Sequence, residues 1–215
     1  MYDVAIQILK EIHELGYEAY IVGGYPRDLY IGFYNNDIDL CSNIDEHTLF
    51  SNFNIISKTQ FGSFTIEKNG YEFELTHFRK DKYIDNRYPI VTFVNTLKED
   101  LERRDFIINT LCIDYNGNYI DLLDARKDID NKIIRVVGNV ENKMTEDPLR
   151  IIRTLRFAAD LNFEIEKNLM EFIKKNKFLL KNLSKTRLEK EIKKIKNKTN
   201  FYNLIKQLDL IDYIQ

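Results

Sequence analysis

The sequence predicts an α+β fold, in which a mixed β-sheet head with flanking helices precedes an all-helical neck. Three observations support this prediction. Short apolar runs bounded by glycine and turn residues fill the first part of the chain. Asn69-Gly70, between two such runs, is a strong signal for a type I′ hairpin. From about Thr145 onward, glycine and proline nearly vanish and apolar residues recur at helical spacing. We therefore expect two domains, covering residues 1–140 and 141–215.

The elements of the head follow from local patterns. Apolar residues at helical spacing predict a helix over residues 4–15, which Gly16 ends. A short apolar strand, Ala19–Val22, runs into Gly23-Gly24, and Pro26 suits the first turn of a helix that reaches Ile31. Further strands are predicted over residues 37–41, 63–68, 71–77, 107–114 and 119–122.

Composition excludes several classes of protein. With 44% hydrophobic and 31% charged residues, the chain is typical of globular proteins. No apolar run approaches the length of a membrane-spanning helix, so we expect no membrane partner and a cytoplasmic location. Two cysteines without CxxC spacing argue against a disulfide scaffold or a structural zinc site. His13, His47 and His77 are not spaced as metal ligands, and we interpret them as structural.

Charge is distributed unevenly. The net charge is −2, yet basic residues far outnumber acidic ones between residues 166 and 200. This asymmetry indicates either a solvated, lysine-rich helical face or a surface that meets phosphates, and charge alone favours the solvated face.

The candidate chemistry begins at Gly23-Gly24, which lie shortly before Asp37-Ile38-Asp39. Adjacent glycines let backbone N–H groups approach a phosphate closely. In a strand, Asp37 and Asp39 would project from one face about 6–7 Å apart, a spacing that suits divalent cations bridging both carboxylates and a triphosphate. Glu74, on a neighbouring predicted strand, could act as base toward an attacking hydroxyl. The alternatives are a solvent-facing strand and an ordinary glycine turn.

The string VGGYPRDLYIGFYNNDIDL resembles the signature of polymerase-β-type nucleotidyltransferases, and more narrowly that of the family of tRNA CCA-adding enzymes and bacterial poly(A) polymerases. Four further strings resemble that family in the same order: ELTHFR (74–79), RRDFIINTL (103–111), EDPLRIIRTLRFAADL (146–161) and LSKTRLEKEIKK (183–194). The resemblance extends from about residue 18 to residue 196. It implies a two-metal Mg²⁺ site held by Asp37 and Asp39, with Glu74 as the third catalytic carboxylate.

The same resemblance implies a set of nucleotide-binding residues. Arg104 and Asp105, supported by Asn109, would hold the incoming nucleotide, with the carboxylate accepting from a ribose hydroxyl. Asp147 and Arg150 would read the base edge; their alternative is a plain i,i+3 helix ion pair. The residues expected to bind nucleotide are Gly23, Gly24, Arg27, Arg104, Asp105, Asn109, Asp147, Arg150, Arg153 and Arg156.

Other stretches carry weaker expectations. Thr145 can cap the helix that contains EDPLRIIRTLRF. The segment between Arg79 and Arg103 resembles the part of the family that helps to switch from C to A, with Asp85 and Arg87 as candidate contacts. Arg187 and Glu191, one helical turn apart, are expected to brace each other. The last predicted helix carries an apolar side that would pack against a second chain or a missing C-terminal domain.

The resemblance therefore implies template-independent addition of C and A to the 3′ end of tRNA, or of another RNA, with CTP, ATP and Mg²⁺. Poly(A), A-only and CC-only addition remain alternatives within the family. A catalytically weak regulator that binds nucleotide or RNA is the alternative from another class, and a hydrolase built on the two aspartates is a more distant one.

Overall fold

The computed structural model describes residues 1–83 and 89–214 and confirms the α+β class with a mixed sheet. The chain forms two compact units. The first unit comprises Met1–Lys82, Ile90–Arg104 and Ile108–Arg126, and the second comprises Tyr83–Pro89, Asp105–Ile107 and Lys127–Gln215. The boundary between residues 140 and 141 stays a prediction.

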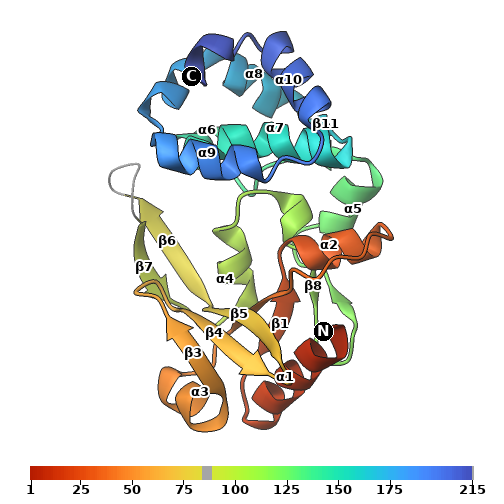
Figure 1. Ribbon diagram of the computed structural model, residues 1–215, viewed down its shortest axis with the longest axis vertical. Helices are drawn as coiled ribbons and strands as arrows, with labels where there is room; N and C mark the ends of the chain where they lie inside the picture. The colour runs from red at the N-terminus through yellow and green to blue at the C-terminus, as the bar shows by residue number, and fades with distance from the viewer. Residues whose placement is uncertain (84–88, 215) are drawn as a thin grey trace. The chain divides into compact units, whose positions relative to one another are not determined.

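The first unit is built on a seven-stranded sheet with the order β3-β4-β5-β2-β1-β8-β9. Figure 1 labels β1, β3, β4, β5 and β8 of this sheet. Within this sheet β2 pairs with β5 in parallel, whereas the other neighbouring strands are antiparallel. The strands are β1 (Ala19–Val22), β2 (Asp39–Ser42), β3 (Asn54–Lys58), β4 (Ser63–Lys68), β5 (Tyr71–His77), β8 (Cys112–Ile113) and β9 (Tyr119–Ile120). A separate two-stranded sheet joins β6 (Arg79–Tyr83) to β7 (Pro89–Phe93).

The alternation of side chains gives this sheet two different faces. Ile21, Leu40 and Leu75 belong to the larger core, which they share with helices α1 (Tyr2–Glu14) and α3 (Glu46–Asn52). Their neighbours Val22 and Cys41 point the other way. They share a smaller core with helix α4 (Leu97–Glu102) and with Cys112. The side chains of alternate residues on β2 therefore face α1 and α3 on one side and α4 on the other.

Several predicted elements agree with the structure. The first helix, strands β1, β4 and β5 and the turn at Asn69 (φ 53°) and Gly70 (φ 79°) lie where the sequence places them. Helix α2 (Gly24–Tyr30) begins at the second of the two glycines, and Gly23 is its N-cap.

Two predicted strands differ. The strand expected over residues 37–41 begins only at Asp39, because the side chain of Asn35 accepts a hydrogen bond from the backbone N–H of Asp37 and holds that segment in a turn. The strand expected over residues 107–114 is a 3₁₀ turn, η1 (Ile107–Asn109), followed by the short β8. The backbone N–H of Ile107 bonds to the carbonyl of Arg135 instead of joining the sheet. The last predicted strand ends at Ile120.

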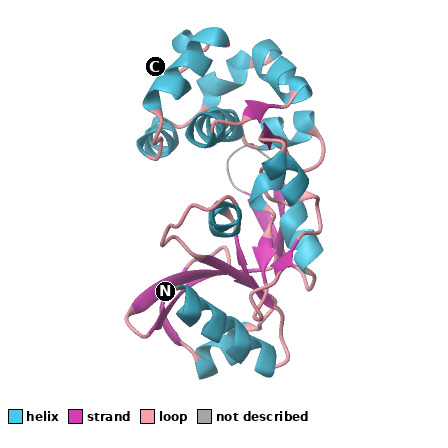
Figure 2. Cartoon of the chain, turned by 90° about the vertical axis from the view of Figure 1, so that its right-hand side faces the viewer, coloured by secondary structure: helices cyan, strands magenta, loops and turns pink. Residues whose placement is uncertain are grey.

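The second unit is mainly helical, as Figure 2 shows by its cyan elements. Helix α7 (Leu149–Leu161) lies at its centre and packs against α6, α9 and α10. Its buried face carries Ile151, Ile152 and Leu155, and it ends at Asn162 in the left-handed conformation. The other elements are α5 (Ala125–Asp130, which straddles both units), α6 (Val140–Glu146), α8 (Lys167–Lys175), η2 (Lys177–Asn182), α9 (Lys185–Lys193), α10 (Lys198–Gln207), η3 (Ile211–Tyr213) and the parallel pair β10 (Ile133–Ile134) and β11 (Glu164–Ile165).

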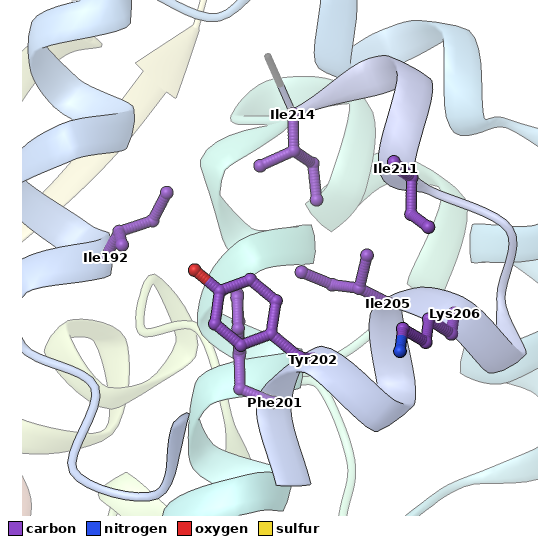
Figure 3. A pocket seen from close by; sticks show the side chains of 7 residues that line it. All are labelled: Ile192, Phe201, Tyr202, Ile205, Lys206, Ile211 and Ile214. Atoms are coloured by element: carbon purple, nitrogen blue, oxygen red, sulfur yellow. The ribbon is translucent and has the colours of Figure 1, made fainter. Parts of the chain in front are cut away.

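Two expectations for the second unit need revision. Thr145 does not cap a helix: it lies inside α6, where its hydroxyl donates to the carbonyls of Glu141 and Asn142. The apolar side of α10 is not bare either, because Phe201, Ile205 and Leu208 are buried within the unit. Beside them lies an apolar pocket whose rim exposes Tyr202 and Ile211 (Figure 3). A second chain or further domain at this helix stays a prediction.

Among the described residues, no helix combines the length and the apolar character needed to cross a bilayer. The cytoplasmic location stays a prediction.

Leu40→Ala tests the central packing of β2. Leu40 is 1% exposed, and deleting its buried methyl groups leaves a cavity, so we expect the free energy of unfolding to fall by about 2–5 kcal/mol. The same substitution at Leu122, which is 47% exposed, is expected to cost less than about 0.5 kcal/mol. Urea denaturation followed by circular dichroism measures both, and equal losses would contradict the burial of Leu40.

Candidate active site

Two of the three predicted catalytic carboxylates lie side by side across the centre of the sheet. Asp39, the first residue of β2, is in register with Val22 of β1 on one side and with Glu74 of β5 on the other. Residues in register on neighbouring strands project from the same face, so the Asp39 and Glu74 carboxylates share the face that α4 covers further along β2. Asp37 lies two residues before Asp39, outside the strand, and is exposed.

Gly23 directly follows Val22 and lies against the Asp39 carboxylate. Its φ of +84° is in the left-handed region, and a Cβ on Gly23 would come within 3.3 Å of Asp39 Oδ2. Glycine therefore meets two requirements here: an unusual backbone conformation and the close approach of a carboxylate.

The residues at this edge fit a divalent cation of the Mg²⁺ type. Carboxylate oxygens are hard donors, and Mg²⁺ is commonly held by one or two carboxylates while it keeps several waters. Asp37 and Asp39 carry carboxylates of this kind, but β2 begins only at Asp39, so the two do not project from one strand face as expected, and their joint binding of a metal ion stays a prediction. In the described part of the chain, no group of three or more His, Cys, Asp or Glu side chains is gathered closely enough to hold a metal ion without other ligands.

Arg27 and Asn109, both predicted to bind nucleotide, come together although 82 residues separate them. Arg27 is 5% exposed; its Nη1 donates to Asn109 Oδ1 at 2.5 Å, and its Nε donates to Asp28 Oδ1 at 2.8 Å. A Cβ on Gly24 would lie 3.3 Å from the guanidinium. In this structure Arg27 therefore braces the glycine turn against the segment that carries Asn109.

Arg104 and Asp105 are adjacent in sequence but do not pair with each other. Arg104 pairs with a carboxylate, and Asp105 pairs with a guanidinium group. Arg104 Nη2 donates to Asp100 Oδ2 at 2.8 Å in the first unit. Asp105 Oδ2 accepts from Arg153 Nε at 2.7 Å in the second unit. Asp100 was not predicted from the sequence. It lies three residues before Arg103 and four before Arg104, which is the spacing of ion pairs on a helix.

In the second unit, Asp147 is fixed at both oxygens. Its Oδ1 accepts from the backbone N–H of Leu149 at 3.1 Å, and its Oδ2 accepts from Arg187 Nη2 at 2.8 Å. Arg150, which is 6% exposed, donates to Glu146 Oε2 and to the carbonyl of Lys143, each at 2.8 Å. The expected brace between Arg187 and Glu191 is therefore wrong, since Arg187 reaches back to the predicted base-reading aspartate.

Glu191 instead orients the two remaining arginines of α7. Its Oε1 accepts from Arg156 Nε at 2.6 Å and lies 3.7 Å from Arg153 Nη1. The Arg156 guanidinium also lies 4.2 Å from the centre of the Phe157 ring. Burial lowers the pKa of Arg156, whereas for Arg153 the nearby Asp105 and Glu191 carboxylates outweigh burial and raise the pKa. Both side chains stay charged at neutral pH.

The other predictions have mixed outcomes. Asp85 and Arg87 lie outside the described residues. His77 is buried between Phe64 and Phe93, and burial lowers its pKa. His13 stacks on Tyr115 with ring centres 3.9 Å apart.

Gly23→Ala, compared with Gly16→Ala, tests the contact with Asp39. Both glycines have a φ near +85°, so both substitutions strain the backbone, but nothing lies within 4 Å of a Cβ on Gly16. We expect similar losses of thermal stability, and at least about tenfold weaker Mn²⁺ binding only for Gly23→Ala. Manganese titration followed by electron paramagnetic resonance measures the Mn²⁺ affinity of each variant. Equal affinities in Gly23→Ala and Gly16→Ala would show that Gly23 does not shape the carboxylate site.

Two segments of the chain match described protein families. Residues 19–135 match the family described as "Poly A polymerase head domain", and residues 162–214 match "Probable RNA and SrmB- binding site of polymerase A". The chain is 39% identical over 199 residues to the CCA-adding enzyme of Lactobacillus johnsonii, covering 91% of this chain and 50% of that enzyme. It is 41% identical over 194 residues to that of Ligilactobacillus salivarius, covering 87% and 47%.

Solved structures show the same similarity. The Bacillus stearothermophilus CCA-adding enzyme in complex with CTP matches with a TM-score of 0.89 and 32% identity, over 97% of this chain and 52% of that one. A tRNA nucleotidyltransferase complexed with a primer tRNA and an incoming ATP analog matches with a TM-score of 0.80 and 29% identity, over 96% and 62%. The chain thus spans about half the length of the curated relatives it matches. On this sequence and structural evidence, the chain belongs to the tRNA nucleotidyltransferase and poly(A) polymerase family.

Proposed function

We propose that this chain carries the catalytic centre of a template-independent nucleotidyltransferase that adds C and A to the 3′ end of tRNA, using CTP, ATP and Mg²⁺. The observation that carries the proposal is the alignment of Asp39 with Glu74 across two parallel strands, with Gly23 packed against the Asp39 carboxylate. Its relatives' names, CCA-adding enzyme, support the choice of RNA and of product.

In this proposal the carboxylates divide the work of phosphoryl transfer. Asp37 and Asp39 would hold Mg²⁺, which when bound supplies positive charge to the reacting phosphate. Glu74 is exposed on the same face as Asp39, and its carboxylate would accept the proton of the RNA 3′-hydroxyl. The 3′-oxygen then forms the new bond to the α-phosphorus as the bond to pyrophosphate breaks.

Base choice would rest on Asp147 and Arg150. Cytosine and adenine each offer an exocyclic amine to a carboxylate and a ring nitrogen to a guanidinium, whereas uracil and guanine place a carbonyl where Asp147 needs a donor. The bonds from Leu149 and Arg187 fix the direction in which the Asp147 carboxylate points. A fixed acceptor discriminates better than a mobile one, because it cannot turn away from a mismatched carbonyl.

The basic surface between residues 166 and 200 would meet RNA phosphates, since it lies within the segment whose family description includes RNA binding. That description favours the phosphate-binding interpretation over a merely solvated lysine-rich face.

Incubation of tRNA transcripts that end before CCA, with Mg²⁺ and each labelled nucleotide singly and together, tests the function. Ordered incorporation of C and then A is expected. Addition of A alone, of C alone or of long A tails would identify one of the other activities of the family. No transfer under any condition would favour a regulator that only binds nucleotide or RNA.

Asp39→Asn tests the metal-binding carboxylate. An amide keeps the shape but not the charge that holds the cation, so we expect kcat to fall by at least about 10³-fold without loss of folding. Asp3→Asn, at an exposed position of the first helix, is the matched control and is expected to keep full activity. Single-turnover transfer of labelled C measures both, and more than about a tenth of wild-type activity in Asp39→Asn would contradict the assignment.

Arg187→Gln tests whether Arg187 orients Asp147. Without the ion pair the carboxylate can rotate, so we expect the preference for CTP over UTP, measured as the ratio of kcat/KM values, to fall by about 5–20-fold. Lys190→Gln removes an exposed charge from the same helix and is expected to leave this ratio unchanged. A loss of activity equal for both nucleotides would point to a structural role instead.

A further inference from the structure

The row of side chains that contains Asp39 and Glu74 continues beyond these carboxylates onto two further strands. Thr65 of β4 is in register with Glu74, and Ser57 of β3 is in register with Thr65. Figure 1 shows β3, β4 and β5 side by side in the first unit. Because residues in register project from one face of a sheet, Thr65 and Ser57 share the face of the two carboxylates. These two residues are here called the hydroxyl pair.

The hydroxyl pair depends on an irregularity in the edge strand β3. Ile55 lies opposite Ile66, and the next pair in register is Ser57 with Thr65. Ile56 is therefore an extra residue, a β-bulge. In a regular strand Ile56 would lie opposite Thr65 and would bring an apolar side chain into the row. The bulge places a hydroxyl there instead, and Ser57 Oγ lies 2.7 Å from Thr65 Oγ1, within hydrogen-bond distance.

The face that carries the hydroxyl pair is accessible from outside. Glu74 and Ser57 are exposed, and Thr65 is partly exposed. The alternate residues of β4, Phe64 and Ile66, are buried in the larger core on the opposite face. Among the described residues, the smaller core at α4 includes none from β3 or β4. A ligand can therefore reach the hydroxyl pair without displacing the core of the unit.

The spacing of the strands relates the hydroxyl pair to the reacting hydroxyl. Neighbouring strands lie about 4.8 Å apart, so Thr65 is one strand spacing from Glu74 and two from Asp39. In the proposed function, Glu74 accepts the proton of the RNA 3′-hydroxyl. The 2′-hydroxyl is on the adjacent carbon of the same ribose, and Thr65 is the next residue of the row after Glu74.

The charge of this face favours a neutral sugar hydroxyl over a phosphate. Glu67 of β4 is in register with Glu72 of β5. Each lies two residues from a member of the row, so both project from the same face as Glu74. These three carboxylates repel a phosphate group, whereas they do not repel an uncharged ribose. A threonine hydroxyl can both donate to and accept from a sugar hydroxyl.

We propose that the hydroxyl pair binds the 2′-hydroxyl of the ribose at the RNA 3′ end: Thr65 forms the hydrogen bond, and Ser57 orients the Thr65 hydroxyl. This inference rests on the proposed function and deepens it, because it assigns the choice of an RNA end over a DNA end to two residues outside the strings that carry the family resemblance. The 2′-hydroxyl is the group that distinguishes RNA from DNA. An end that lacks it forms one hydrogen bond fewer with this face and therefore binds more weakly.

The test uses two tRNA transcripts that end before CCA and differ only in the terminal sugar, which is ribose or 2′-deoxyribose. We expect the chain to bind the ribose end about fivefold more tightly, the effect of one hydrogen bond. Thr65→Val keeps the shape of the side chain but removes the hydroxyl, so it is expected to bind both transcripts with equal affinity. Fluorescence anisotropy with Mg²⁺ and without nucleotide measures these affinities in the absence of transfer.

Three further variants separate the hydroxyl from the fold. Thr65→Ser restores the hydroxyl and is expected to recover the preference for ribose. Ser57→Ala leaves the Thr65 hydroxyl unoriented and is expected to lower the preference about twofold. Ser51→Ala is the matched control, because Ser51 is exposed on α3 and its hydroxyl donates to the carbonyl of His47, and it is expected to keep the full preference.

The deoxyribose transcript reports structural damage. The proposal requires that Thr65→Val bind this transcript as tightly as the unchanged protein does, and that it lose affinity only for the ribose transcript. Weaker binding of both transcripts by Thr65→Val would overturn the proposal. So would equal binding of both transcripts by the unchanged protein, or a preference for ribose that Thr65→Val keeps.

Because binding is measured without nucleotide, the result is independent of the proposed reaction. A preference for ribose that disappears in Thr65→Val, in a protein that transfers no nucleotide, would leave the ribose site standing and remove the proposed function. Nucleotide transfer by a protein that binds both transcripts equally would do the reverse.

Discussion

The register of β2 between β1 and β5 is the constraint on which the rest of the candidate site depends. Val22, Asp39 and Glu74 form one row across three strands, and Gly23 follows the first of them. Because side chains alternate along a strand, a slip of one residue would turn Asp39 toward the core of α1 and α3 and would expose Leu40. The apolar residues Ile21, Leu40 and Leu75 prevent that slip by filling the opposite face. The core of the first unit thus stabilises the sheet and also determines the face from which the Asp39 and Glu74 carboxylates project.

A second pattern is that the predicted nucleotide-binding arginines and the residues next to them are oriented by carboxylates. Asp100 holds Arg103 and Arg104, Asp105 holds Arg153, and Glu191 lies between Arg153 and Arg156. Buried ion pairs of this kind add little net stability, because desolvation offsets the attraction. Their effect is to restrict the rotamers of long side chains before a ligand arrives, which reduces the entropy lost on binding. We expect such a site to lose function when a supporting carboxylate such as Asp100 or Glu191 is removed, even where that carboxylate makes no contact with the ligand.

How far the sequence predicted this arrangement depends on the range of the interactions. The strand Ala19–Val22, the hairpin at Asn69-Gly70 and the helix of EDPLRIIRTLRF follow from local patterns, and the structure has them. The late start of β2 and the 3₁₀ turn at Ile107 depend on hydrogen bonds accepted by the side chain of Asn35 and the carbonyl of Arg135, which no periodicity reveals. The distant ion-pair partners of the site residues could not be predicted from local sequence. Asp147 pairs with Arg187, 40 residues away, and Arg153 pairs with Asp105, 48 residues away. Asp100 and Glu146 had a local signal, because each lies at helical distance from the arginines that it meets.

Lysine and arginine occupy different positions in this chain because their side chains differ in how strongly they are hydrated. Lysine dominates the exposed helical surface of the second unit, where a compact, strongly hydrated ammonium keeps its water and acts through charge alone. Arginine occupies the half-buried positions of the candidate site, because its weakly hydrated, planar guanidinium can be taken out of water and still donate along several fixed directions. Replacing Arg103 or Arg153 by lysine would therefore preserve charge but lose the planar arrangement that lets one side chain meet two acceptors. The placement of arginine in this chain marks where geometry matters more than charge.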